Sequence, residues 1–224
     1  MRGTERKDRQ EKVGFSKLAK EVMALASYRD IRLKVEQRIR EFEKLRSKGT
    51  DRDWFSELCF CIMTANSTAR LGIEIQKALG DGCITMSPAG VESLLRKRGH
   101  LFARPRADYI CRARVHRKIK AIIESFPDDA SAREWLVENI FGLGYKESSH
   151  FLRNTGHFGV AILDRHILKI MEEYSLIPAV PKTLTRKRYL EIETKLAELA
   201  EKVDMPLGVL DFYLWYMRTG EILK

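Results

Sequence analysis

The sequence contains no long hydrophobic run. No apolar segment approaches the ~20 residues that a helix needs to cross a bilayer. The first residues, MRGTERKDRQEK, are charged and lack the apolar centre of a secretory signal. We therefore expect a protein that is not secreted and acts inside the cell, in the cytoplasm or at the nucleoid.

Cysteine and histidine are few and scattered. The four cysteines, Cys59, Cys61, Cys83 and Cys111, form no C-x-x-C pair, and the five histidines lack the spacing of metal ligands. Zinc and iron–sulfur sites need clustered ligands, so we expect neither a metal nor another cofactor. Because nothing indicates secretion, we expect the thiols to be reduced.

The alternation typical of β-strands is also absent, and helical spacing of apolar residues dominates. The fold class is therefore predicted to be all-α. Asp53, Ser131 with Glu134, and Asp164 have the positions of helix caps. Helices are expected over residues 11–47, 54–79 with a polar interruption at 66–68, 88–97, 107–125, 131–140, 146–154, 165–174, from Thr183 or Thr185 to 203, and from Pro206 to Gly220.

Basic residues are in excess. The formal net charge is +10, which favours a polyanionic partner, and without a membrane element nucleic acid is the better candidate. Between Arg96 and Lys120 there are ten lysines and arginines and one acid, with Phe102 and Tyr109 interleaved. This stretch is either a phosphate-binding surface or a solvated helix face.

A glycine-spaced turn, FGLGYK, separates two of the predicted helices. Gly142 and Gly144 permit positive φ and close approach of another backbone, and Tyr145 completes the turn. The following helix directs unpaired N–H groups and its positive dipole end at the turn, which suits a DNA phosphate. An ordinary helical hairpin with a glycine turn is the alternative.

Lys146 follows that turn directly. A cation is disfavoured at a helix N-terminus, so we expect a lowered pKa for this amine and greater nucleophilicity. Asp164, eighteen residues later, is an ordinary N-cap candidate that could also assist the lysine, and the intervening chain is long enough for them to meet. A lysine nucleophile beside a carboxylate is the arrangement for Schiff-base chemistry at a sugar C1′.

The helix–GLGYK–helix unit followed by LDRH resembles the helix-hairpin-helix DNA glycosylase superfamily. No cysteine follows Cys111, which disfavours its iron–sulfur branch. The stretches SELCFCIMTANSTARLGIEIQKAL and VLDFYLWYMRTGEILK resemble the second, largely archaeal class of 8-oxoguanine DNA glycosylases, over roughly residues 30–224. The resemblance implies two helical subdomains flanking a cleft: a central one over 51–124, and 1–50 with 125–224 carrying the hairpin motif.

The resemblance also implies roles for individual residues. Lys146 would be the nucleophile and Asp164 the essential carboxylate. The last residue, Lys224, would reach the base pocket, with Trp215 and Phe102 as its walls and Asp211 at the base edge. The hairpin residues Gly142, Gly144 and Tyr145 would contact DNA, and so would five other residues: His166, Asn66, Arg70, Arg104 and Arg106. Which of the last four enters the duplex is left open.

The function implied is excision of 8-oxoguanine through a lysine Schiff base, with AP lyase activity and no metal, by a monomer acting on double-stranded DNA. Three alternatives remain open: a related glycosylase for another base such as an oxidised pyrimidine, a non-enzymatic helix-hairpin-helix DNA-binding module, and a helical protein-interaction domain whose charge is incidental.

Overall fold

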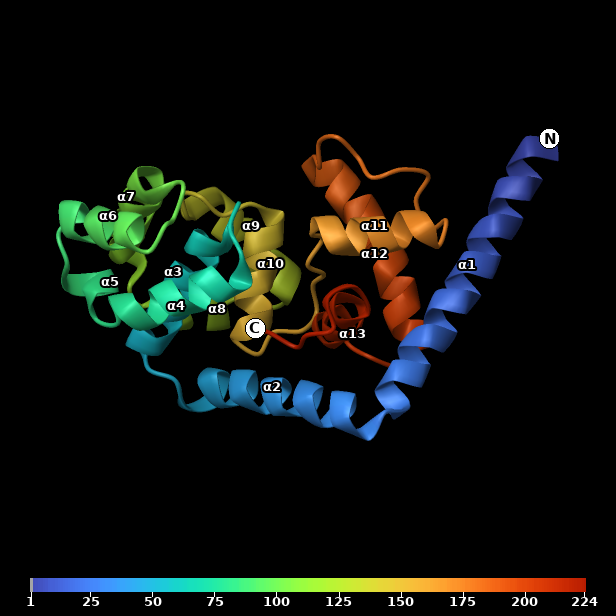
Figure 1. Cartoon of the computed structure of the whole chain (residues 1–224), viewed down its shortest axis with the longest axis horizontal. Helices are drawn as coiled ribbons and strands as arrows, with labels where there is room; N and C mark the ends of the chain where they lie inside the picture. The colour runs from blue at the N-terminus through green and yellow to red at the C-terminus, as the bar shows by residue number, and fades with distance from the viewer. Residues whose placement is uncertain (1) are drawn as a thin grey trace. The chain divides into compact units, whose positions relative to one another are not determined.

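The computed structural model describes the backbone of residues 2–224 and the side chains of residues 10–224. The described part of the chain is helical and contains no strand, which confirms the predicted fold class (Figure 1). Its elements are α1 (Arg2–Ser27), α2 (Arg29–Lys48), α3 (Asp51–Thr64), α4 (Ala69–Leu79), α5 (Gly82–Thr85), α6 (Pro88–Lys97), α7 (Ala103–Ala113), η1 (Arg114–His116), α8 (Ile119–Glu124), α9 (Asp129–Asn139), α10 (Tyr145–Asn154), α11 (Arg165–Glu173), α12 (Arg186–Lys202) and α13 (Leu207–Thr219).

The chain divides into two compact units. One contains the residues up to Arg40 together with Phe158–Leu223, and the other contains Glu41–His157 together with Lys224. This differs from the expected division at about residues 50 and 125. The reason is that α10, beyond the expected boundary, packs against α3, so the hairpin shares a core with the central helices.

In the first unit, α13 packs against α1, α11 and α12. The apolar residues of α11 recur at helical spacing, and Ile167, Ile170 and Met171 are buried as a result. Leu18 and Val22 of α1 are fully buried as well. These contacts fix the start of α11, where Asp164 lies.

In the second unit, α3 is the central helix. It contacts α4, α7, α8 and α10, and every residue from Leu58 to Thr64 is buried. A helix that is apolar on all sides is stable only when neighbours cover it fully. Among all the buried residues of α3, Glu57 is the one carboxylate, and it is 5% exposed.

Several helix ends differ from the prediction. The N-cap of α3 is Thr50, and Asp53 lies at N3, where the two residues form a capping box. The cap of α9 is Asp128, which accepts from the N–H of Ser131, so Ser131 lies inside the helix. The caps at Asp164 and Thr185 are confirmed.

Three predicted helices are divided. The helix expected over 11–47 is instead α1 and α2, which are separated by a bend at Tyr28. The polar interruption at 66–68 ends α3 at Thr64, and Asn66 adopts φ of 58°, a left-handed conformation that asparagine tolerates. The helix expected over 107–125 is instead α7, η1 and α8, and α7 begins at Ala103. Arg104 and Arg106 therefore lie in the first turn of α7, whereas the prediction placed them in a loop.

None of the described helices combines the length and the apolar character needed to cross a bilayer.

Candidate active site and nucleic-acid interface

The hairpin between α9 and α10 is built on one left-handed glycine. Gly142 has φ of 87°, and a Cβ placed there would lie 2.4 Å from Cδ2 of Tyr109. Gly144 has φ of −96°, so this residue does not use the positive φ that glycine permits. Gly142 is thus required by conformation and close packing, while Gly144 leaves space next to the helix start.

The N-terminus of α10 carries no side-chain cap. Gly144 occupies the N-cap position and is exposed, and the first N–H groups of the helix therefore face the hairpin without a capping oxygen. A helix N-terminus of this kind favours an anion. The hairpin thus has the backbone geometry of a phosphate site.

Lys146 lies in the first turn of this helix. Its side chain is 28% exposed, and its Nζ lies 3.3 Å from Oε1 of Glu147, which is 15% exposed. An acidic side chain is stabilised at a helix N-terminus. Glu147 therefore complements the helix dipole and supplies an opposite charge beside the half-buried amine, and the sequence prediction did not include this neighbour.

Arg106 braces the hairpin from α7. It is 7% exposed, and its Nη2 donates to the carbonyl of Ala65 at 2.9 Å while Nη1 lies 3.5 Å from the carbonyl of Gly142. Its guanidinium also lies over the Tyr109 ring at 5.6 Å. Arg106 thus connects the α3–α4 turn to the hairpin. A DNA contact by Arg106 stays a prediction. Arg104, two residues earlier on α7, is exposed.

The loop before α7 presents apolar side chains to solvent. Leu101 is 88% exposed and Phe102 is 44% exposed. His100 fixes their backbone, because its Nδ1 accepts from the N–H of Phe102 at 3.1 Å and its Nε2 lies 2.9 Å from the carbonyl of Met63. Phe102 is therefore not core packing. Asn66 and Arg70 are also exposed, and they follow Met63, the residue that His100 contacts, within seven positions of the chain.

In the other unit, Asp164 caps α11. Its Oδ1 accepts from the N–H of His166 at 2.8 Å and of Ile167 at 2.9 Å. One carboxylate oxygen thus makes both capping bonds, as predicted, and Oδ2 lies outside the cap. The carboxylate is held in one orientation while keeping an oxygen for another partner.

Trp215 and His166 contact each other in the same unit. Their rings lie 4.9 Å apart at 81°, an edge-to-face arrangement. Trp215 is half-buried, and its Nε1 is a buried atom without a hydrogen-bond partner. Asp211, one turn earlier on α13, is 8% exposed. The structure thus brings Trp215 next to His166. Separate roles were predicted for these two residues, and a contact between them was not.

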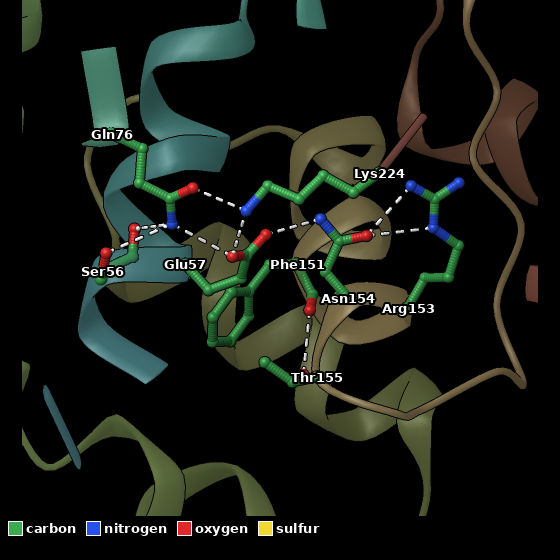
Figure 2. Close-up of polar contacts among 8 residues, drawn as sticks. All are labelled: Ser56, Glu57, Gln76, Phe151, Arg153, Asn154, Thr155 and Lys224. Atoms are coloured by element: carbon green, nitrogen blue, oxygen red, sulfur yellow. Dashed lines mark hydrogen bonds and ion pairs between the residues drawn. The ribbon is translucent and has the colours of Figure 1, made fainter. Parts of the chain in front are cut away.

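Lys224 is bound by polar side chains of the second unit, as Figure 2 shows. Its Nζ donates to Oε2 of Glu57 at 2.7 Å and to Oε1 of Gln76 at 2.6 Å. Asn154 of α10 donates to the other Glu57 oxygen at 2.6 Å. The ammonium also lies 4.3 Å from the centre of the Phe60 ring. We call Glu57, Gln76, Asn154 and Lys224 the Lys224 network.

The sequence contained a signal for this network that the prediction missed. Glu57 interrupts an otherwise apolar run, WFSELCFCIM, and a buried carboxylate in such a run needs a partner. Its partners could not be found by spacing, because Lys224 lies 167 residues away and Asn154 lies 97 away.

His150 is a further buried group that the prediction did not include. It lies one turn after Lys146 on α10 and is 8% exposed, and the main chain of Lys224 lies beside its ring. Burial lowers the pKa of His150 well below its ordinary value, and the positive charges of Arg153, Lys146 and Lys224 act in the same direction. The ring packs edge-on against Phe60 at 5.5 Å.

Comparison with known proteins identifies the family. A family model described as 8-oxoguanine DNA glycosylase matches residues 35–205. This chain belongs to that family. A relative in Methanocaldococcus jannaschii named 8-oxoguanine DNA glycosylase/AP lyase is 52% identical over 190 residues, covering 85% of this chain and 91% of the relative. A relative of the same name in Korarchaeum cryptofilum is 46% identical, covering 95% and 100%.

Solved structures of the family have the same fold. The crystal structure of the Methanocaldococcus jannaschii 8-oxoguanine DNA glycosylase matches with a TM-score of 0.89 at 49% identity, covering 93% of this chain and 97% of that one. The enzyme of that organism in complex with 15mer DNA containing 8-oxoguanine matches with a TM-score of 0.89 at 48% identity, covering 92% and 99%. The predicted family resemblance is confirmed.

Proposed function

We propose that this protein excises 8-oxoguanine from double-stranded DNA and cleaves the resulting abasic site. The observation that carries the proposal is Lys146, half-buried in the first turn of an uncapped helix that follows a glycine hairpin. Relatives named 8-oxoguanine DNA glycosylase/AP lyase support both activities. The action on DNA would place the protein, as a monomer, with the nucleoid.

DNA binding would begin at the hairpin. A phosphate oxygen would accept from the first N–H groups of α10, and Gly144 would allow its approach. Contacts of this kind position the duplex and carry no sequence information. Arg104 and Arg70 would add charge, while Asn66 would occupy the space that the extruded nucleotide leaves.

The chemistry would require Lys146 to lose a proton before it attacks. Nζ would then form a bond to C1′ as the C1′–N9 bond breaks, and the base would leave with a proton. Asp164, through the oxygen outside its cap, would stabilise positive charge developing on the sugar. The C1′–O4′ bond would then break, with O4′ taking up a proton, to give a Schiff base between Nζ and C1′. This Schiff base would lose a C2′ proton and expel the 3′ phosphate, which is the lyase step. This scheme uses no metal or other cofactor.

The base would be held by stacking and by contacts at its edge. Trp215 and Phe102 would supply the two faces, with Asp211 at the edge and His166 at a phosphate. Since the ammonium of Lys224 is bound to Glu57 and Gln76, base recognition by this residue would fall to its main-chain atoms. Oxidised guanine carries a hydrogen at N7 that guanine lacks, and a single acceptor there would distinguish the two.

Borohydride trapping tests the proposal. The protein is incubated with a panel of duplexes, each with one damaged base, and reduced with borohydride. We expect a covalent complex on the 8-oxoguanine duplex that is lost in Lys146→Gln and kept in Lys202→Gln, an exposed control on α12. A complex only with an oxidised pyrimidine would indicate the related glycosylase. Absence of any trapped complex would indicate a DNA-binding module without enzymatic activity.

A further inference from the structure

The Lys224 network buries a carboxylate and an ammonium within the second unit. Glu57 is 5% exposed and Asn154 is fully buried. Both oxygens of Glu57 are used: Oε2 by Lys224 and by Nε2 of Gln76 at 3.1 Å, and Oε1 by Asn154. A buried carboxylate persists only when its charge is paired and its lone pairs are satisfied.

Neighbouring groups fix each member of the network in turn, as Figure 2 shows. Nε2 of Gln76 also donates to the carbonyl of Ser56 at 3.0 Å, which orients the amide so that its oxygen faces Lys224. The Asn154 oxygen accepts from Nε and Nη2 of Arg153 at 3.1 Å and 3.0 Å, so its nitrogen faces Glu57. The acceptors that receive the ammonium are therefore arranged by the fold.

We propose that Glu57 is a positioning residue for base recognition. By binding the ammonium of Lys224, it would fix the main-chain atoms of that residue. The ammonium lies over the Phe60 ring, and this ring packs against His150 on α10, the helix that also carries Lys146. This inference rests on the proposed function, in which those main-chain atoms contact the damaged base. Glu57 itself would touch neither the base nor the sugar.

The alternative is that the network only stabilises the fold. A buried ion pair is weak evidence of stabilisation, because desolvation offsets much of the attraction. The ion pair between Glu57 and Lys224 is instead suited to specifying the position of Lys224. The two interpretations differ in one respect: a positioning role affects only reactions in which a base must be recognised.

The test compares two substrates under single-turnover conditions. One duplex contains 8-oxoguanine, and the other contains a preformed abasic site, which has no base to recognise. Glu57→Gln keeps the shape of the side chain and removes its charge, and Lys224→Met removes the ammonium. We expect each variant to lower excision of 8-oxoguanine on the order of 10²-fold, the cost of misplacing a contact by about 1 Å, and to leave the abasic-site rate unchanged.

The double variant identifies the route of the effect. If Glu57 acts through Lys224, the combined variant Glu57→Gln, Lys224→Met excises no more slowly than either single variant. Multiplied losses would overturn the inference, as would an equal loss on both substrates. Glu36→Gln serves as the matched control, since Glu36 pairs with Arg32 and Arg40 on the exposed surface of α2.

Two further outcomes are distinguishable. A wild-type protein that does not excise 8-oxoguanine would refute the proposed function, whereas an active wild type with an equally active Glu57→Gln would refute the role of Glu57 alone. Thermal unfolding shows whether the variants are folded. If Glu57→Gln does not fold, Gln76→Met removes the other acceptor of the ammonium from a half-buried position, and the same pattern with Lys224→Met is expected.

Discussion

Oδ1 of Asp164 accepts a hydrogen bond from the N–H of Ile167 at 2.9 Å, and the same oxygen accepts from His166. The carboxylate thus begins α11 with one oxygen and has a second one outside the cap. The capping role of this side chain and its proposed catalytic role can therefore be separated by substitution, because asparagine retains a capping oxygen but carries no charge.

Asp164→Asn is expected to keep the stability of the wild type and to lose most of its excision activity. Asp164→Ala is expected to lose activity and also about 1 kcal/mol in the free energy of unfolding, because the cap is removed. Urea unfolding and single-turnover excision measure the two effects. Full activity in Asp164→Asn would show that the charge has no catalytic role.

The two hairpin glycines should respond differently to alanine. Gly142→Ala forces a side chain into φ of 87° and against Tyr109, which we expect to cost about 1–3 kcal/mol of stability. Gly144→Ala meets only Oε2 of Glu147 at 3.4 Å and should fold normally. Its effect should be weaker DNA binding, measured by fluorescence anisotropy, because the methyl group hinders a phosphate. Equal stability of the two variants would contradict this distinction.

The arginines of α7 provide a second matched pair. Arg106→Ala leaves the carbonyls of Ala65 and Gly142 without a donor, and we expect a loss of about 1–3 kcal/mol in the free energy of unfolding. Arg104→Ala should leave stability unchanged and reduce the slope of log K against log salt by about 0.9, the value for one phosphate contact. A salt slope equal to that of the wild type would remove Arg104 from the DNA interface.

Protein stability should decrease in mild acid because His150 is buried in its neutral form. Its pKa in the folded protein lies well below the ordinary value of 6.5, so below that pH the unfolded chain binds a proton that the folded chain does not. The free energy of unfolding should therefore fall as the pH is lowered from about 7 to about 5. The expected slope from this one group approaches about 1.4 kcal/mol per pH unit.

The variant His150→Leu should show a shallower pH dependence in urea unfolding. The slope would not vanish, because the pKa of His157 is also lowered by burial. His166, which is half-buried on α11, provides the control in His166→Leu. An identical pH dependence in wild type and His150→Leu would show that His150 does not govern the acid sensitivity.

Most of the helices and the hairpin could be predicted from local signals, whereas the roles proposed for Lys146 and Asp164 came from the family resemblance. Gly142 and Gly144 mark a turn, Asp164 precedes an apolar periodic run, and Thr185 and Pro206 mark helix starts. Each of these signals acts within about one helical turn of the residue concerned. The misplaced caps at Asp53 and Ser131 show the limit of such signals, since a second capping residue lay within three positions of each.

Tertiary contacts could not be predicted in this way. The bond from Arg106 to Ala65 and the network around Glu57 join segments that are far apart in the chain, and spacing carries no information about them. The pattern indicated only that Glu57 would need a partner if buried. The burial of Arg106 was missed because a basic residue in a basic stretch resembles a surface residue in every local respect.

The ten residues of α10 have a consequence for accuracy during catalysis. Lys146 lies in its first turn and Asn154, which holds Glu57, is its last residue. Eight residues at about 1.5 Å each separate them by roughly 12 Å along a stiff rod. Thermal displacement of this helix would carry Lys146, the proposed nucleophile, and the support of Lys224 by the same amount, so the distance between them would persist.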